Sequence, residues 1–140
     1  MAQNTIRLAG TCKWARLHDL DEKYECWGLT LYPDEESKKV FDASGLKLKI
    51  NEDEDGLHFS LRRKPEAKFK DETKQLAPPK VIDADGRSLD ADEVRSIGNG
   101  SSVICTVEVY ETKKYGMGHR LVAVRVTNHI PYTPRDMEIY

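Results

Sequence analysis

The chain has 140 residues, a formal net charge of −2, and 39% hydrophobic and 33% charged residues, which suits one domain with a substantial core. No apolar run approaches the ~20 residues that a membrane-spanning helix requires, and the N-terminus lacks the apolar segment of a secretory signal. We therefore expect no membrane association and no secretion. The three cysteines are odd in number and widely spaced, which predicts buried free thiols in a reducing cytoplasm rather than disulfides or a zinc site.

The N-terminal third of the chain predicts two strands followed by a helix. Residues 5–17 form a long predicted strand, whose two competing hydrophobic faces are reconciled by a bulge or a bend. Residues 24–32 form the second strand, in which large apolar side chains alternate. The helix is expected to begin near Pro33, because the acids that follow suit the positive end of a helix dipole, and to run to about residue 43 before Gly45 stops it.

The rest of the chain predicts further strands separated by turns and loops. Residues 46–50 suit either a strand or a loop, and residues 65–79 are rich in lysine without a strand or helix period, which predicts a loop. Residues 90–94 suit a single helical turn. The remaining predicted strands are residues 57–64, 81–82, 102–110 and 121–127. The last two of these strands are expected to form a hairpin with a basic, aromatic tip that contains glycines.

These elements predict a mainly β fold. About five substantial strands, one short helix and long loops are most simply a closed five-stranded OB-fold barrel. An SH3-like barrel and a small sandwich are the alternatives. We expect the domain to span residues 1–130 and residues 131–140 to form a C-terminal tail, since Pro131 and Pro134 cannot continue a central strand.

Opposite charges are separated along the chain. Residues 33–56 contain eight acids against four lysines, whereas residues 62–80 contain seven bases against three acids. The net negative charge alone argues against a nucleic-acid partner. Binding of a polyanion depends on the local potential, however, and such a separation favours a bipolar surface.

Basic groups interleaved with aromatic rings predict binding of single-stranded nucleic acid, which needs cations for the backbone and rings on which bases stack. In an OB barrel, strands two and three and their flanking loops form one binding face, where these groups could converge. For Trp27 the competing interpretation is a core position beside Leu29. Phe69 is a further, weaker candidate for stacking. The predicted site residues are Trp14, Tyr24, Trp27, Arg62, Lys64, Lys68, Lys113, Lys114, Tyr115, His119 and Arg120.

Other chemistries have little support in the sequence. The run from Asn51 to Gly56 matches the first half of an EF-hand calcium loop, but Arg62 stands at position twelve, where a bidentate glutamate is needed. The sequence has no Gly-x-Ser-x-Gly motif, no phosphate-binding glycine loop and no His-Glu-x-x-His motif. We therefore expect no metal site, no cofactor and no enzymatic activity.

Residues 78–86, residues 97–101 and the strands at 103–110 and 121–126 resemble the C-terminal half of the OB-fold single-stranded DNA-binding proteins of short-tailed phages. The run from Gly10 to Pro33 is also similar. The resemblance implies a protein that binds single-stranded DNA during phage DNA replication, recombination and repair in the cytoplasm of the bacterial host. It further implies replication proteins as partners and a homodimer as a candidate assembly.

One feature departs from that family, and one alternative function stays open. Family members commonly end in a long acidic tail that contacts replication partners, whereas residues 131–140 hold only two acids. The alternative is a non-catalytic OB-fold adaptor that binds other proteins through its acidic side, residues 34–55.

Overall fold

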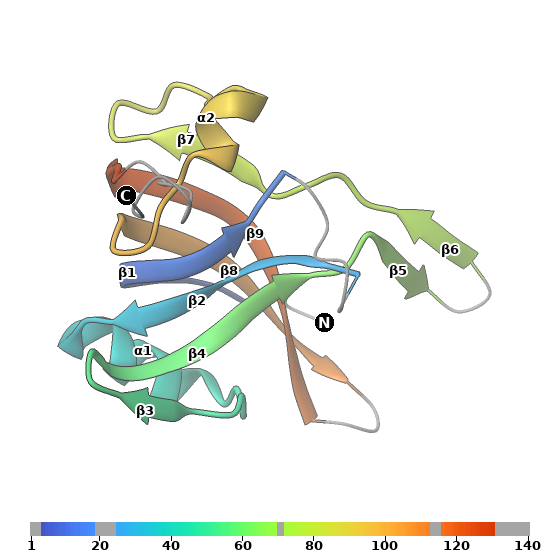
Figure 1. Cartoon of the computed structure of the whole chain (residues 1–140). Coiled ribbons are helices and arrows are strands. Elements are labelled where there is room, and N and C mark those ends of the chain that lie inside the picture. Colours follow the sequence, from blue (N-terminus) through green and yellow to red (C-terminus); the bar gives the residue numbers. More distant parts are fainter. Residues whose placement is uncertain (1–3, 19–24, 70–71, 113–115, 131–140) are drawn as a thin grey trace.

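The computed structural model describes residues 4–18, 25–69, 72–112 and 116–130, which form one curled sheet, a separate hairpin and two helices (Figure 1). In chain order the elements are β1 (Asn4–Arg16), β2 (Trp27–Pro33), α1 (Glu35–Ser44), β3 (Asn51–Asp53), β4 (Gly56–Arg63), β5 (Glu66–Phe69), β6 (Glu72–Gln75), β7 (Lys80–Asp83), α2 (Ala91–Arg95), β8 (Ser102–Thr112) and β9 (Gly116–Asn128). Neither helix in these ranges is long and apolar enough to cross a membrane.

The large sheet has seven strands in the order β3-β4-β2-β1-β8-β9-β7. All neighbouring pairs are antiparallel except β7 and β9, which are parallel. The sheet curls until β4 approaches β9, and side chains join these two strands in place of a backbone ladder. The backbone N–H of Arg62 donates to His119 Nε2 at 3.0 Å, and Arg63 Nη1 donates to the carbonyl of Leu121 at 3.3 Å. We call this junction the β4–β9 seam.

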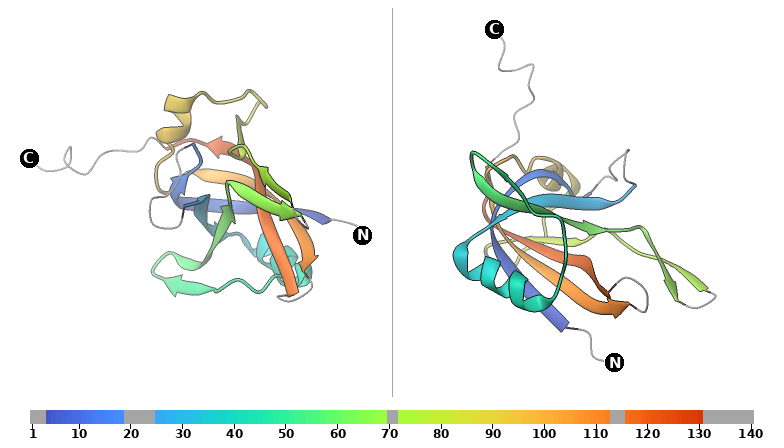
Figure 2. Two further views of the ribbon diagram at one scale, coloured as in Figure 1. Left: turned by 90° about the vertical axis from the view of Figure 1, so that its right-hand side faces the viewer. Right: turned by 90° about the horizontal axis from the view of Figure 1, so that it is seen from below.

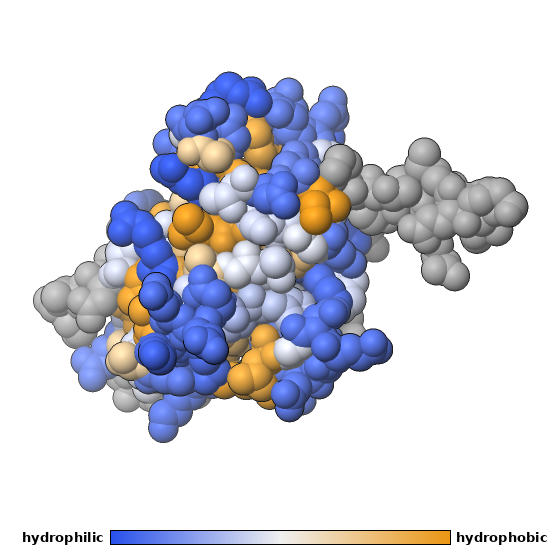
Figure 3. Space-filling view, turned by 90° about the vertical axis from the view of Figure 1, so that its left-hand side faces the viewer, coloured by the Kyte–Doolittle hydropathy of each residue, from blue (hydrophilic) through white to orange (hydrophobic). Residues whose placement is uncertain are grey.

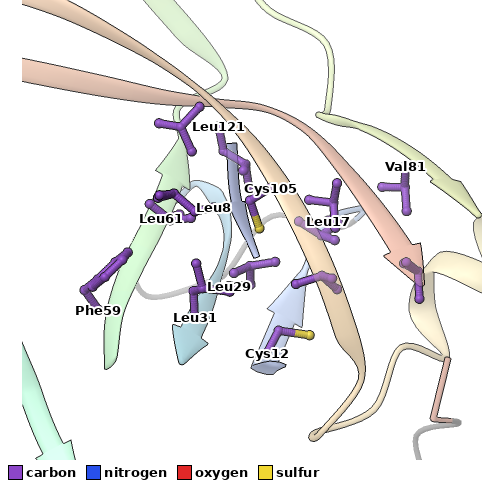
Figure 4. Packing of buried hydrophobic residues seen from close by; sticks show 14 of the residues in the cluster. Leu8, Cys12, Leu17, Leu29, Leu31, Phe59, Leu61, Val81, Cys105 and Leu121 are labelled. Atoms are coloured by element: carbon purple, nitrogen blue, oxygen red, sulfur yellow. The ribbon is translucent and has the colours of Figure 1, made fainter. Parts of the chain in front are cut away.

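The core lies inside the curled sheet and is filled by the alternating inward residues of its strands (Figure 4). The predicted inward set on β8 is confirmed, since Val103, Cys105, Val107 and Val109 are all buried. Burial of apolar side chains at about 1.5–3 kcal/mol each is the main term that stabilises such a barrel. The largest fully buried side chains are Phe41, Phe59, Leu8, Leu31, Leu61 and Leu121.

Helix α1 closes one end of the barrel. Its Phe41 ring stacks on Phe59 of β4, with centroids 4.2 Å apart. The side chain of Asp34 accepts from the backbone N–H of Ser37 and caps the first turn, while Gly45 ends the helix with a φ of 85° that suits glycine. Ser37 is buried and its hydroxyl accepts from the backbone N–H of Ala9, which ties the helix to β1. The predicted start and end of this helix are confirmed.

The predicted bulge in the first strand is also confirmed. Lys13 pairs with Thr30 while Arg16 pairs with Gly28, so three steps along β1 match two along β2. Because the extra residue reverses the alternation, both Cys12 before the bulge and Leu17 after it are buried. Each of the competing hydrophobic faces therefore points inward over part of the strand.

Two parts of the chain differ from the sequence-based expectation. The segment at 65–79 was predicted to be a loop, and this is wrong, since β5 and β6 form an antiparallel hairpin. The described part of β6 is exposed throughout, so burial imposes no alternation that the sequence could display. The strand count is also higher than five, because short strands lie beside the main barrel strands, and α2 supplies a second helix at the predicted helical turn.

The β5–β6 hairpin and the far end of the β8–β9 hairpin project to the same side of the barrel (Figures 1 and 2). The opposite side carries several small apolar patches, separated by neutral and hydrophilic residues over the described part of that surface (Figure 3). The molecule therefore has one side with two projecting arms and one side without them.

All three cysteines are free and buried, as expected from their spacing. Burial raises the pKa of the Cys12 thiol to about 11, and burial likewise raises the pKa of Cys105. Neither of these two thiols is therefore a thiolate at neutral pH, and both act as small apolar core residues.

Candidate nucleic-acid interface

The outward surface of β1, β2 and β4, which we call the outer face, is organised in rows by strand register. The side chains of neighbouring strands that pair directly lie close together on one face of a sheet. Three such rows cross the outer face: Arg16, Gly28 and Arg62; Lys13, Thr30 and Ser60; and Thr11, Tyr32 and His58. The first row carries two guanidinium groups, and the middle row combines a lysine with two small hydroxyl residues.

A pocket of about 150 Å³ lies on the outer face between these rows. Small side chains make room for it, because Gly28, Thr30 and Ser60 are among its lining residues together with Arg16 and Arg62. Gly28 is required for a second reason, since a Cβ at this position would lie 2.5 Å from the carbonyl oxygen of Leu61. The missing side chain of Gly28 therefore allows both the close approach of β2 to β4 and the pocket on the outer face.

Trp14 forms one edge of the pocket and is the most unusual residue of this surface. Its side chain is 61% exposed although it is large and apolar. Its φ is 52°, in the left-handed region, which costs a non-glycine residue roughly 1–2 kcal/mol. The backbone N–H of Trp14 donates to Asn99 Oδ1 at 2.8 Å. A strained backbone that presents an exposed ring is typical of a functional position rather than of packing.

An acidic turn, residues 53–55, lies against the middle and third rows of the outer face. Lys13 Nζ forms a salt bridge with Asp55, and Tyr32 donates from its hydroxyl to Asp53 Oδ2 at 2.6 Å. The hydrogen bond to Asp55 raises the pKa of Lys13, and the hydrogen bond from Tyr32 lowers the pKa of Asp53. The Lys13 ammonium also lies 5.6 Å from the centroid of the Trp14 ring. This end of the face is therefore locally neutralised by carboxylates.

In the described part of the β8–β9 hairpin, Arg120 and His119 both have partners within the fold. Arg120 Nη1 forms a 2.7 Å salt bridge with Glu108, its cross-strand neighbour, and its guanidinium lies 5.3 Å from the centroid of the Tyr110 ring. His119 Nε2 accepts the backbone N–H of Arg62 at the β4–β9 seam. Burial, and to a smaller extent the charge of Arg62, lowers the pKa of His119 to about 4. The ring is therefore neutral at pH 7, as an acceptor nitrogen must be.

The structure brings some of the predicted site residues together and not others. Trp14 and Arg62 both line the pocket, and Lys64 is exposed just beyond β4. Trp27 is 7% exposed, and its indole N–H donates to the carbonyl of His18, which agrees with the competing core interpretation. Lys68 belongs to β5. The remaining predicted positions lie outside the described residues: Tyr24, Lys113, Lys114 and Tyr115.

Sequence reasoning missed most of the pocket itself. Arg16, Thr30 and Ser60 carry no motif, and their relation depends on the pairing of β1 with β2 and of β2 with β4. The alternation along each strand could have indicated which residues face outward. It could not give the register, because the bulge in β1 shifts that register by one residue.

The five strands β1, β2, β4, β8 and β9, rolled into a barrel with a helix at one end, are an OB fold, as predicted. No protein-family model and no curated protein matches the sequence. Solved structures do match the fold. One is gp2.5, a single-stranded DNA-binding protein encoded by bacteriophage T7, with a TM-score of 0.68, 16% identity, and coverage of 98% of this chain and 93% of that chain.

A second similar structure is the single-stranded DNA-binding protein of bacteriophage Enc34 in complex with single-stranded DNA. It has a TM-score of 0.63 and 15% identity, with coverage of 92% of this chain and 89% of that chain. At this level of identity the likeness shows a shared fold over nearly the whole chain. The resemblance noted in the sequence therefore extends to the three-dimensional structure.

Proposed function

We propose that this protein binds single-stranded DNA without sequence preference and without catalysis, as part of phage DNA replication, recombination and repair in the cytoplasm of a bacterial host. The proposal assigns binding to the OB-fold domain of residues 1–130. It is supported by the shared fold, since both similar structures are single-stranded DNA-binding proteins and one of them contains the DNA. The tail, residues 131–140, lies outside the described residues.

The observation that carries the proposal is the exposed Trp14 ring at the edge of a pocket lined by Arg16 and Arg62. Single-strand binding by an OB fold requires an aromatic platform for a base and cations for the phosphates on either side. Stacking on such a ring contributes about 1–3 kcal/mol per base. The pocket beside the ring is lined by the apolar Cys26 and Leu29 and by the hydroxyl residues Thr30 and Ser60, a mixture that suits the edge of a base.

The test is fluorescence anisotropy with a labelled oligo-dT strand, the matching RNA and a DNA duplex of equal length. We expect oligo-dT to bind more tightly than the duplex. We also expect the affinity to fall steeply with salt, with a slope of about −0.7 per phosphate neutralised, because bound phosphates release counterions. An affinity that is equal at low and high salt would contradict the assignment of Arg16 and Arg62 to phosphates.

The alternative, a protein-interaction adaptor, makes a different prediction in the same experiment. Its candidate surface includes Glu35 and Glu36 at the exposed start of α1. An adaptor binds neither the single strand nor the duplex at any salt concentration. Loss of the oligonucleotide only in the presence of a divalent metal would instead indicate a nuclease.

A further inference from the structure

The part of β1 around the strained backbone of Trp14 forms hydrogen bonds with a loop, residues 97–101, rather than with a neighbouring strand on that side. The ladder between β1 and β8 ends at Thr11 and Ser102. Beyond that point the loop at 97–101 takes over as the partner of β1. The N–H of Cys12 donates to the carbonyl of Ser101 at 2.9 Å, and the N–H of Gly100 donates to the carbonyl of Cys12 at 2.8 Å.

Asn99 continues this pairing with its side chain instead of its backbone. Its Oδ1 accepts the N–H of Trp14 at 2.8 Å, at the bulge where β1 gains a residue relative to β2. The side chain of Asn99 is exposed, so it contributes little to the apolar core. Its hydrogen bond is made to the N–H of the residue in β1 whose φ is positive.

The loop that carries Asn99 is itself firmly anchored. Ser101 is fully buried, and its hydroxyl donates to the carbonyl of Gly98 at 2.8 Å and accepts the N–H of Ile130 at 2.9 Å. The N–H of Gly98 donates to the carbonyl of Ile130 at 2.7 Å. The side chain at position 99 therefore extends from a fixed support, and removing it leaves these loop contacts in place.

We propose that Asn99 is a positioning residue for single-strand binding, which holds Trp14 in its strained conformation so that the ring forms the edge of the pocket. This inference rests on the proposed function. Asn99 acts through the backbone of Trp14 and needs no contact with DNA. A platform fixed before binding loses less conformational freedom when a base stacks on it, so its affinity is higher than that of a mobile ring.

The first test compares Asn99→Ala with Asn99→Asp and with the control Asn128→Ala, an exposed asparagine at the end of β9. We expect Asn99→Ala to weaken oligo-dT binding by about tenfold, within the range of one stacking contact, and to leave the melting temperature within a few degrees. Asn128→Ala is expected to bind like the parent chain. Unchanged affinity in Asn99→Ala would overturn the inference.

A spectroscopic readout separates positioning from general stability. The chain has two tryptophans, so the emission of Trp14 is isolated in a Trp27→Phe background. We expect Asn99→Ala to shift this emission and its quenching by acrylamide, and Asn99→Asp to restore both, because a carboxylate oxygen also accepts the N–H. Equal emission from all three chains would show that Asn99 does not position the ring.

The second test is a double-mutant cycle on the melting temperature. Trp14→Gly should melt higher than Trp14→Ala, because glycine adopts a positive φ without strain. If Asn99 imposes that φ, the difference in melting temperature between Trp14→Gly and Trp14→Ala shrinks in an Asn99→Ala background. An unchanged difference overturns the inference.

Binding separates a failure of this inference from a failure of the proposed function. Full oligo-dT affinity in Trp14→Ala would contradict the proposed function at this face. Weak binding in Trp14→Ala together with normal binding in Asn99→Ala would overturn only the role of Asn99.

Discussion

The outer face and the β8–β9 hairpin are both rich in aromatic and cationic residues, but the two regions use them differently. On the described part of the hairpin, Arg120 is paired with Glu108 and His119 holds the β4–β9 seam. On the outer face, Trp14 is mostly exposed beside a pocket with two arginines. The comparison shows that a cationic run in a sequence does not by itself predict a DNA-binding surface. Its availability to DNA depends on which of its side chains already have partners in the fold.

The largest expected effect concerns His119 and the stability of the seam. The pKa of His119 is lowered from 6.5 to about 4. Between pH 4 and pH 6.5 this histidine is therefore protonated in the unfolded chain and neutral in the folded chain. The contribution of His119 to the free energy of unfolding is therefore complete above about pH 6.5 and is lost as the pH falls toward 4, by up to about 3 kcal/mol. Urea unfolding at pH 7, 6 and 5 measures this loss.

A matched pair of variants isolates the contribution of that ring. His119→Gln keeps an acceptor for the N–H of Arg62 but does not titrate, so we expect its stability to change less between pH 7 and pH 5. His18→Gln removes an exposed histidine and keeps His119, so the pH dependence assigned to the seam should persist. Equal pH dependence in His119→Gln and the parent chain would assign the effect to other groups.

The next effect compares the two aromatic candidates for base stacking. Trp14→Ala should weaken oligo-dT binding by about 1–3 kcal/mol, because it removes the exposed platform of the outer face. Tyr115, at the predicted hairpin tip, lies outside the described residues, and for Tyr115→Ala we expect weaker oligo-dT binding with an unchanged melting temperature. Anisotropy and thermal unfolding of both variants decide which region supplies stacking. A loss only in Tyr115→Ala would reverse the ranking of the two regions.

The arginines of the two regions should differ by a smaller amount. Arg62 is exposed and lines the pocket, and Arg120 is half-buried, forms a salt bridge with Glu108 and packs against Tyr110. We expect Arg62→Ala to reduce the salt slope of oligo-dT binding by about 0.7, the value for one phosphate contact on a single strand. Arg120→Ala should leave the slope unchanged and reduce stability instead. The opposite result would place the phosphates on the hairpin.

The smallest expected effect tests the acidic turn. Asp55→Asn removes the partner of Lys13, which then becomes available to a phosphate next to Trp14. Since an exposed salt bridge is screened by solvent and salt and contributes little, we expect only a small gain in oligo-dT affinity, largest at low salt. Glu54→Gln, on the same turn, serves as the control. Weaker binding in Asp55→Asn would show that the carboxylate supports the outer face.

Much of the fold could be predicted because its causes are local. The acids after Pro33, the stop at Gly45 and the alternation in residues 103–109 each act within a few residues, and the structure bears them out. The β5–β6 hairpin could not be predicted, since exposed strands show no hydrophobic period. The extra residue of β9 at the Thr106/Val107 register shift, one of two such shifts between β8 and β9, was also missed. It leaves Val122 only half-buried although it continues the alternation of its strand.

The candidate site was predicted only in part because it is built from long-range pairings. Trp14 and Arg62 were proposed from residue type and from their predicted strands, and the fold places both at one pocket. Their neighbours Arg16 and Ser60 belong to the same surface through strand register. Trp27 illustrates the converse, because alternation places it on the face of Leu29, and its burial agrees with the competing core interpretation rather than with a stacking role.

The β4–β9 seam has a further consequence for the dynamics of the barrel. Because no ladder joins these two strands in the described part of the chain, the barrel is a rolled sheet that closes between β4 and β9 through side chains, while β3 and β7 form the edges of the sheet itself. Opening at this line breaks a few contacts, whereas opening between β1 and β8 breaks a continuous run of backbone hydrogen bonds. Amide hydrogens along the facing edges of β4 and β9 should therefore exchange with solvent before those of β1 and β8.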